Sequence, residues 1–147
     1  MEIVIDANIT VALFVRLPYS DQAETLFRLW RKQGVQLYAP ALWPSEVIST
    51  LRKVVAAGQM TEEDARQSVA GFALLPVQVV LPEANLLQAS LDWAGKLGQI
   101  VAYDAQYVAL AKHLDAEFWT ADNNLFKALE KLKTPFVHWV GEITTDT

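Results

Sequence analysis

Short apolar runs alternate along the chain with longer amphipathic segments. Five runs are rich in β-branched or aromatic residues and are bounded by Pro, Asp or a turn, as expected of strands: 3–5, 35–40, 76–82, 117–122 and 135–140. Between them, apolar residues recur at helical spacing in 9–15, 22–33, 42–57, 61–72, 83–97, 102–111 and 123–132. Because strands alternate with helices, the pattern predicts one three-layer α/β domain over residues 1–147, with a mostly parallel sheet of about five strands flanked by helices. The tail 141–147 has no periodicity and is predicted to fray.

The first strand ends abruptly at polar residues. Ile3, Val4 and Ile5 are apolar without alternation, which indicates a strand covered on both faces, and Asp6 and Asn8 follow at once. Open parallel sheets bind ligands outside the carboxyl ends of their strands, where Asp6 would lie. Asp is also a favoured N-cap of a following helix, so this segment alone leaves a site and a cap both open.

Acidic residues from four separate segments are predicted to meet at this edge of the sheet. Asp6 and Asp122 follow strands, Glu46 lies just past the second strand, and Asp104 lies in the opening turn of a helix. Clustered carboxylates are unfavourable unless a cation neutralises them. Oxygen ligands suit Mg²⁺ or Mn²⁺, and without Cys or a paired His motif the set does not resemble a zinc site. Such a metal would polarise a phosphoryl oxygen and activate water.

Composition narrows the class of protein. With 12 Lys+Arg against 17 Asp+Glu, the net charge of -5 argues against a protein that coats nucleic acid through a basic face. The absence of Cys favours a reducing, cytoplasmic setting. We expect no leader, because the N-terminus lacks a basic region followed by an apolar stretch and a cleavage site, and no membrane partner, because no apolar run reaches membrane-spanning length. The 52% hydrophobic content, with five Trp, fits either an oligomer or partner interface or a well-filled core.

Four motifs in the right order resemble the PIN-domain family, especially its VapC-type toxins. They are Ile3-Val4-Ile5-Asp6-Ala7-Asn8, Pro44-Ser45-Glu46-Val47, Tyr103-Asp104-Ala105-Gln106-Tyr107-Val108-Ala109-Leu110-Ala111 and Trp119-Thr120-Ala121-Asp122. The third motif, followed closely by Thr-Ala-Asp, is the specific one. The resemblance implies a Mg²⁺- or Mn²⁺-dependent endoribonuclease, often a homodimer, held inactive by a small antitoxin protein as part of a toxin-antitoxin pair.

The resemblance also implies roles for individual residues. The family's acidic metal-site and catalytic positions match Asp6, Glu46, Asp104 and Asp122, and its supporting polar positions match Asn8 and Thr120. Two positions depart from the pattern. Ala7 stands where the family usually has Ser or Thr, and Asn124 stands where some members carry another acid.

Other polar and aromatic residues have weaker signals. Arg16, Arg52 and Lys53 are candidate contacts for RNA phosphates, and the alternative is ordinary solvated helix charge. His113 and His138 are interpreted as structural. The tryptophans offer surfaces for base stacking, but core or interface packing is the favoured interpretation for all five: Trp30, Trp43, Trp93, Trp119 and Trp139.

Two other classes compete with a nuclease. A receiver or haloacid-phosphatase domain also ends a strand in Asp, but Asp6-Ala7-Asn8 has no second acid, and no Asp follows the run 77–81 where a receiver's phosphoacceptor would lie. A non-catalytic PIN-like module that binds metal, RNA or a protein partner remains open.

Overall fold

The computed structural model describes residues 1–145 and is organised around a parallel sheet. The five strands have the order β3-β2-β1-β4-β5, with β1 in the centre paired to β2 and β4. Their bounds are Glu2–Ile5 (β1), Gln36–Pro40 (β2), Val77–Val80 (β3), Glu117–Thr120 (β4) and Val137–Trp139 (β5). Ile3, Val4 and Ile5 are almost wholly buried, so the prediction of a central strand covered on both faces is confirmed.

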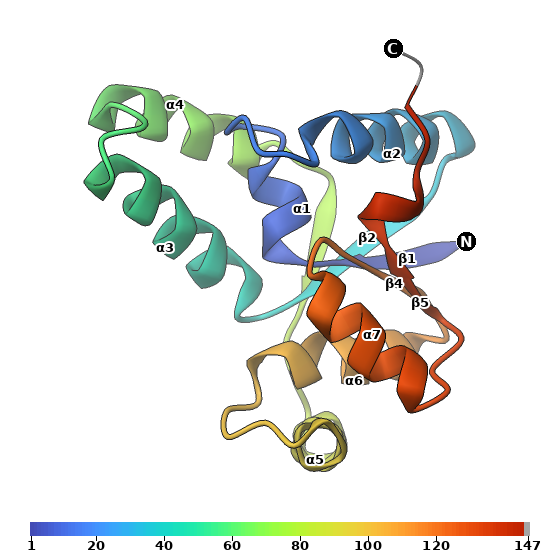
Figure 1. Ribbon diagram of the computed structural model, residues 1–147. Coiled ribbons are helices and arrows are strands. Elements are labelled where there is room, and N and C mark those ends of the chain that lie inside the picture. The colour runs from blue at the N-terminus through green and yellow to red at the C-terminus, as the bar shows by residue number, and fades with distance from the viewer. Residues whose placement is uncertain (146–147) are drawn as a thin grey trace.

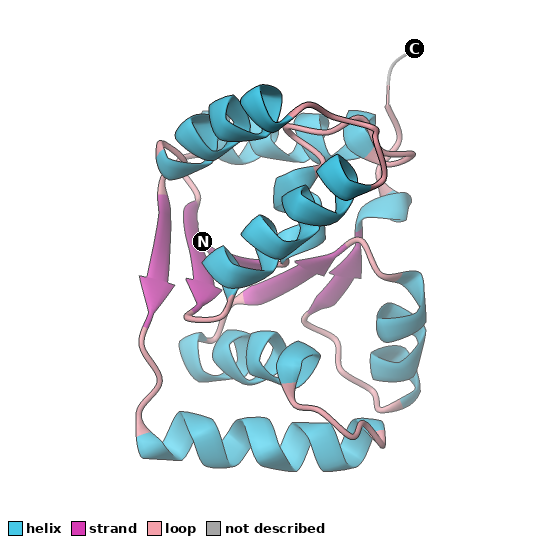
Figure 2. Ribbon diagram, turned by 90° about the vertical axis from the view of Figure 1, so that its left-hand side faces the viewer, coloured by secondary structure: helices cyan, strands magenta, loops and turns pink. Residues whose placement is uncertain are grey.

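Helices cover both faces of the sheet and complete the predicted three-layer α/β architecture. α1 to α4 lie on one side, and α6 lies on the other with α5 outside it (Figure 1). Viewed at right angles, the strands run between these two groups of helices (Figure 2). The bounds are Ala7–Val11 (α1), Ser20–Gln33 (α2), Trp43–Ala56 (α3), Glu62–Ala73 (α4), Ala84–Leu97 (α5), Tyr103–Leu114 (α6) and Asn123–Lys131 (α7).

Local signals set several helix ends. Gly34 and Gly98 end α2 and α5 in the left-handed region, with φ of 67° and 65°, which glycine adopts without steric cost. Thr61 caps α4, because its hydroxyl accepts a hydrogen bond of 3.0 Å from the backbone N–H of Asp64. These helix boundaries agree with the predictions to within a few residues.

The first helix and the tail differ from the predictions. α1 begins at Ala7 rather than Ile9 and ends at Val11, because Asp6 caps it and the Ser20 hydroxyl, bonded to Ala12 O at 2.9 Å, holds the following turn. The predicted fraying is wrong for the start of the tail: Gly141 and Glu142 belong to a 3₁₀ helix, Val140–Glu142, that contacts α2. Residues 146–147 lie outside the described part of the chain.

The tryptophans pack within the fold. Trp30 contacts Trp119 edge-on at 6.0 Å between ring centroids, and Trp119 stacks on His138 at 4.9 Å. Trp43, Trp93 and Trp139 contact Phe side chains. Within residues 1–145, no helix combines the length and the apolar character needed to cross a membrane.

Candidate functional site

A small acidic cavity lies at the carboxyl ends of the two central strands, β1 and β4. Its volume is about 60 Å³, and we call it the acidic pocket. Asp6, Glu46, Asp104 and Asp122 all line it, although they come from four segments spread over the chain. Asn8 and Thr120 line it as well, together with Ala7, Thr50, Tyr107, Phe118 and Leu125.

Asp6 caps α1 and lines the pocket at the same time. Its Oδ1 accepts a hydrogen bond of 2.8 Å from the backbone N–H of Ile9, the N-cap bond of α1. Its Oδ2 accepts from the Thr120 hydroxyl at 2.7 Å and from the Ala121 N–H at 3.0 Å. The two roles that the sequence left open are therefore compatible, and the capping bonds fix the carboxylate at the end of β1.

Burial dominates the electrostatics of Asp6. Only 8% of the residue is exposed, and burial raises its pKa from 3.8 to about 6, against the three hydrogen bonds that favour the ionised form. The negative charge of Asp104 raises this pKa further. The carboxylates therefore repel one another in a partly desolvated space.

Glu46 is held by a tyrosine from another helix. It lies in the first turn of α3, where Pro44 is tolerated, and its Oε1 accepts a hydrogen bond of 2.7 Å from the Tyr107 hydroxyl of α6. Tyr107 is buried and stacks on Phe118 at 5.8 Å. Burial raises the pKa of Glu46, the Tyr107 bond opposes this, and the charge of Asp104 adds to it. Burial and the charge of Glu46 likewise raise the pKa of Tyr107.

The other two acids stand at helix starts. Asp104, in the first turn of α6, accepts a hydrogen bond of 3.0 Å from the Gln99 amide. Burial raises the pKa of Asp104, the Gln99 bond opposes this, and the charge of Asp122 adds to it. Asp122 caps α7, since its Oδ1 accepts from the N–H groups of Asn124 at 2.9 Å and Leu125 at 3.1 Å.

Three uncharged partners of the acids were not predicted from the sequence. Tyr107 lies three residues after Asp104, so helical spacing places it on the same face, and that signal was available. Gln99 and Tyr19 carry no such signal because they lie in or beside loops. Tyr19 is close enough to Asp6 and Asp122 that burial, with their negative charges, raises its pKa to about 12.

The oxygen ligands of the four acids suit a hard divalent cation, but the acids do not converge on a single point. Across residues 1–145, no three acidic or histidine side chains converge tightly enough to form a finished metal site. The chemistry fits nonetheless, because all four acids offer oxygen ligands. Burial raises the pKa values of Asp6, Glu46 and Asp104, and negative charge on a neighbouring acid adds to each, so a cation would stabilise the ionised forms. A carboxylate can accept several bonds, so the hydrogen bonds described above leave coordination sites available.

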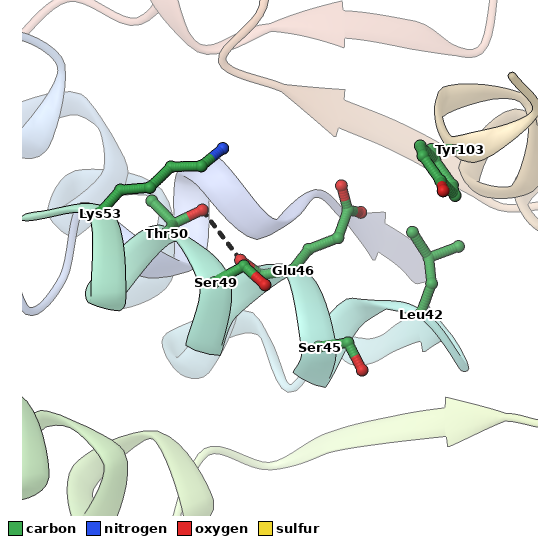
Figure 3. A pocket seen from close by; sticks show the side chains of 7 residues that line it. All are labelled: Leu42, Ser45, Glu46, Ser49, Thr50, Lys53 and Tyr103. Atoms are coloured by element: carbon green, nitrogen blue, oxygen red, sulfur yellow. Dashed lines mark hydrogen bonds between the residues drawn. The ribbon is translucent and has the colours of Figure 1, made fainter.

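A second, larger hollow adjoins the acidic pocket along α3 (Figure 3). We call it the α3 hollow; it measures about 330 Å³ and shares Glu46 and Thr50 with the acidic pocket. It is lined by Leu42, Ser45, Glu46, Ser49, Thr50, Lys53 and Tyr103.

The three predicted phosphate contacts are placed differently. Lys53 lines the α3 hollow. Arg52 points to the other side of α3, lines a groove against α4 and pairs with Glu62 at 3.6 Å, because adjacent helical residues face different directions. Arg16 pairs with Asp21 at 2.7 Å. The structure therefore brings Lys53 towards the acids and leaves Arg16 and Arg52 out of both cavities.

The two departures from the family pattern affect the pocket differently. Ala7 is buried and presents a methyl group to the acidic pocket where the pattern has a hydroxyl. Asn124 is exposed and lines a separate hollow with Lys127, and its contribution to the site is the backbone N–H that it donates to Asp122. The two histidines lie outside the acidic pocket. His113 is in the last turn of α6, and His138, on β5, lies 3.4 Å from Glu117, on β4.

Comparison with known proteins gives consistent matches. A family model described as PIN domain matches residues 4–138. The sequence is 30% identical over 136 residues to Ribonuclease VapC3 of Pyrobaculum aerophilum, covering 92% of this chain and all of that protein.

Solved structures share the fold. VapBC2 from Rickettsia felis, bound to a DNA fragment from their promoter, aligns with a TM-score of 0.65 and 15% identity over 95% of this chain and 97% of that chain. The sarcin-ricin loop cleaving toxin VapC20 of Mycobacterium tuberculosis aligns with a TM-score of 0.63 and 17% identity, over 86% and 94% of the two chains.

Proposed function

The chain belongs to the PIN domain family, and from this membership and its acidic pocket we propose that it is a divalent-metal-dependent endoribonuclease. We propose further that it acts in the cytoplasm as the toxin of a toxin-antitoxin pair. The relative covered over its whole length is named a ribonuclease, and VapC20 is named a toxin. The observation that carries the proposal is the meeting of four carboxylates from four segments in one pocket.

The proposed chemistry assigns a part to each carboxylate. A bound Mg²⁺ or Mn²⁺ would supply a Lewis acid for the phosphoryl group and lower the pKa of water to generate the nucleophile. Asp6, Glu46, Asp104 and Asp122 would hold the metal. Thr120 and Tyr107 would orient Asp6 and Glu46 through the hydrogen bonds that they donate, and Asn8 adds a polar group to the same pocket.

A cleavage assay tests this proposal directly. Purified protein would be incubated with total cellular RNA in Mg²⁺, in Mn²⁺ or in excess chelator, and the RNA ends would be mapped. We expect defined cleavage with either metal and none with chelator. Cleavage that persists in chelator would contradict the metal-dependent mechanism.

The alternative is a non-catalytic PIN-like module that binds metal, RNA or a protein partner. One observation favours it, namely that the described acidic side chains do not form a finished metal site. The cleavage assay separates the two functions, because a binding module would cut no RNA in either metal. A thermal melt with Mn²⁺ would then show whether metal is among its ligands.

A small antitoxin protein is the partner that we propose. The structural similarity to VapBC2 supports this, and so does the acidic character of the pocket, which would accept a basic side chain from an inhibitor. Co-expression with the product of a small neighbouring gene, followed by co-purification and loss of cleavage, would test the pairing.

Lys53 is the phosphate contact that we propose for the RNA. In a protein of net charge -5, a local cation beside the acidic pocket is needed to attract a polyanion. Lys53→Gln should weaken RNA binding and reduce the dependence of the binding constant on salt by about one phosphate contact. Fluorescence polarisation with a labelled single-stranded RNA at several salt concentrations measures both.

Arg52→Gln provides a matched control for Lys53. It removes a neighbouring charge from the same helix, but one that faces Glu62 across the α3–α4 groove. We expect its salt dependence to equal that of the parent. Equal effects of the two substitutions would show that only net charge matters and would remove Lys53 from the site.

We also propose a homodimer formed through helix faces. Leu87 and Leu91 lie one turn apart on α5 with 52% and 70% of their surfaces exposed, a pair of apolar side chains available to a second copy. Sedimentation at tens of micromolar, roughly the range where weak dimers still associate, should show a dimer for the parent and a monomer for Leu91→Glu. A monomeric parent would contradict the proposal.

A further inference from the structure

The α3 hollow has an exposed aromatic ring at one end. Tyr103 begins α6 with 57% of its surface exposed, and among the residues that the structure describes it is the one exposed aromatic side chain. The other aromatic residues, including the tryptophans considered for base stacking, are buried or half-buried. A large ring left in solvent beside a polar cavity is available for a flat ligand.

The opposite end of the hollow is cationic. Figure 3 shows Lys53 and Tyr103 at the two ends, with the Glu46 carboxylate between them. Lys53 forms no ion pair with the described residues, in contrast to Arg16 and Arg52. Glu46 and Thr50 also line the acidic pocket, so the two cavities adjoin and a single ligand could extend from one into the other.

This order of groups matches a single strand of nucleic acid. Such a strand offers a flat base and a backbone phosphate on each nucleotide, so one part can stack on a ring while a nearby phosphate meets a cation. A base inside a duplex already stacks on both neighbours and would have to be extruded first. The remaining hydroxyl groups, from Ser45 and Ser49, are uncharged and do not repel the backbone.

We propose that the α3 hollow binds the nucleotide next to the cleaved bond, with its base stacked on Tyr103 and the backbone running past Glu46 towards Lys53. The inference rests on the proposed ribonuclease function and adds the place where a base beside the cut is held. Tyr103 would then help to select the substrate without taking part in the chemistry.

Steady-state cleavage of a short single-stranded RNA carrying a mapped cleavage site tests the role of Tyr103. Tyr103→Ala should raise KM by about 5- to 150-fold with kcat nearly unchanged, the range that the loss of one stacked base represents. Tyr103→Phe keeps the ring and should match the parent. Removing the base from one nucleotide beside the cut should cost the parent a similar factor and cost Tyr103→Ala nothing further.

Ile100→Ala is a matched control, because Ile100 is a fully exposed side chain three residues away that does not line the hollow. It should leave KM and kcat unchanged. An unchanged KM for Tyr103→Ala, or a fall in kcat alone, would overturn the inference. It would also be overturned if Tyr103→Ala changed the sedimentation of the protein, since the exposed ring would then belong to a protein interface.

The affinity of the protein for oligonucleotides tests the stacking site even if the protein cuts no RNA. In chelator, the parent should bind an adenylate oligonucleotide more tightly than an abasic ribose-phosphate oligomer of the same length, and Tyr103→Ala should bind the two equally. That result supports the stacking site even if the nuclease proposal fails. The same preference in both proteins, or none in the parent, overturns it.

Discussion

Replacing Asp104 with Asn should lower RNA cleavage by about 10²- to 10³-fold while the protein stays folded. Asp104 lines the acidic pocket, and its charge adds to the effect of burial in raising the pKa of both Asp6 and Glu46, so it acts on two of the other acids. The substitution keeps the shape and an oxygen for the Gln99 hydrogen bond but removes one of the charges that would hold the metal. An effect of that size is typical of losing one electrostatic group in an active site.

The measurement is the single-turnover rate of cleavage in saturating Mn²⁺, with the melting temperature as the check on folding. Asp64→Asn is the matched control, because Asp64 is an exposed carboxylate on α4. The Asp64→Asn protein should cleave RNA at the same rate as the parent. Undiminished cleavage by Asp104→Asn would remove Asp104 from the mechanism. If Asp104→Asn melts far below the parent, its low rate would reflect misfolding, and Asp104→Ser would be measured in its place.

Asp6→Asn should raise the melting temperature of the metal-free protein at neutral pH. Burial raises the pKa of Asp6 from 3.8 to about 6, which corresponds to an unfavourable contribution of about 3 kcal/mol at pH values above both. An uncharged amide avoids this contribution, so we expect a rise of up to about 10 °C. Mn²⁺ should then stabilise the parent far more than the variant, because the variant lacks a carboxylate ligand.

The raised pKa of Asp6 fixes the direction in which the stability of the metal-free protein changes with pH. Since the folded-state pKa lies above the unfolded-state value, the native protein binds more protons than the unfolded chain between about pH 4 and pH 6. The free energy of unfolding of the metal-free parent therefore falls as pH rises through this window. The raised pKa values of Glu46 and Asp104 act in the same direction. At pH 4 and below, the advantage of Asp6→Asn should disappear.

Thermal melts at pH 7.5 and pH 4, with and without Mn²⁺, measure these effects. Asp92→Asn, at an exposed position on α5, controls for the loss of one negative charge. If Asp6→Asn melts below the parent at pH 7.5 without metal, the hydrogen bonds from Ile9, Thr120 and Ala121 outweigh the buried charge. Asp6 would then act mainly as a structural cap.

The sequence by itself determined the fold class and the acids of the candidate site. Periodicity is a local property, so the apolar run at 3–5 predicted the central strand, and Gly34 and Gly98 predicted helix ends that the structure confirms. Parallel strands direct their carboxyl ends to one edge, so residues just past strand ends, such as Asp6 and Asp122, were expected to lie near one another.

Only the tertiary structure decided how those acids are held and which neighbours face them. The hydrogen bonds from Thr120 to Asp6 and from Tyr107 to Glu46 join residues 114 and 61 positions apart, a separation over which no local pattern operates. Exposure is also a tertiary property, because whether a side chain is covered depends on which other elements pack against it. The sequence favoured packing for the tryptophans, and the structure confirms it. The sequence did not show that Tyr103 stands exposed beside the acids.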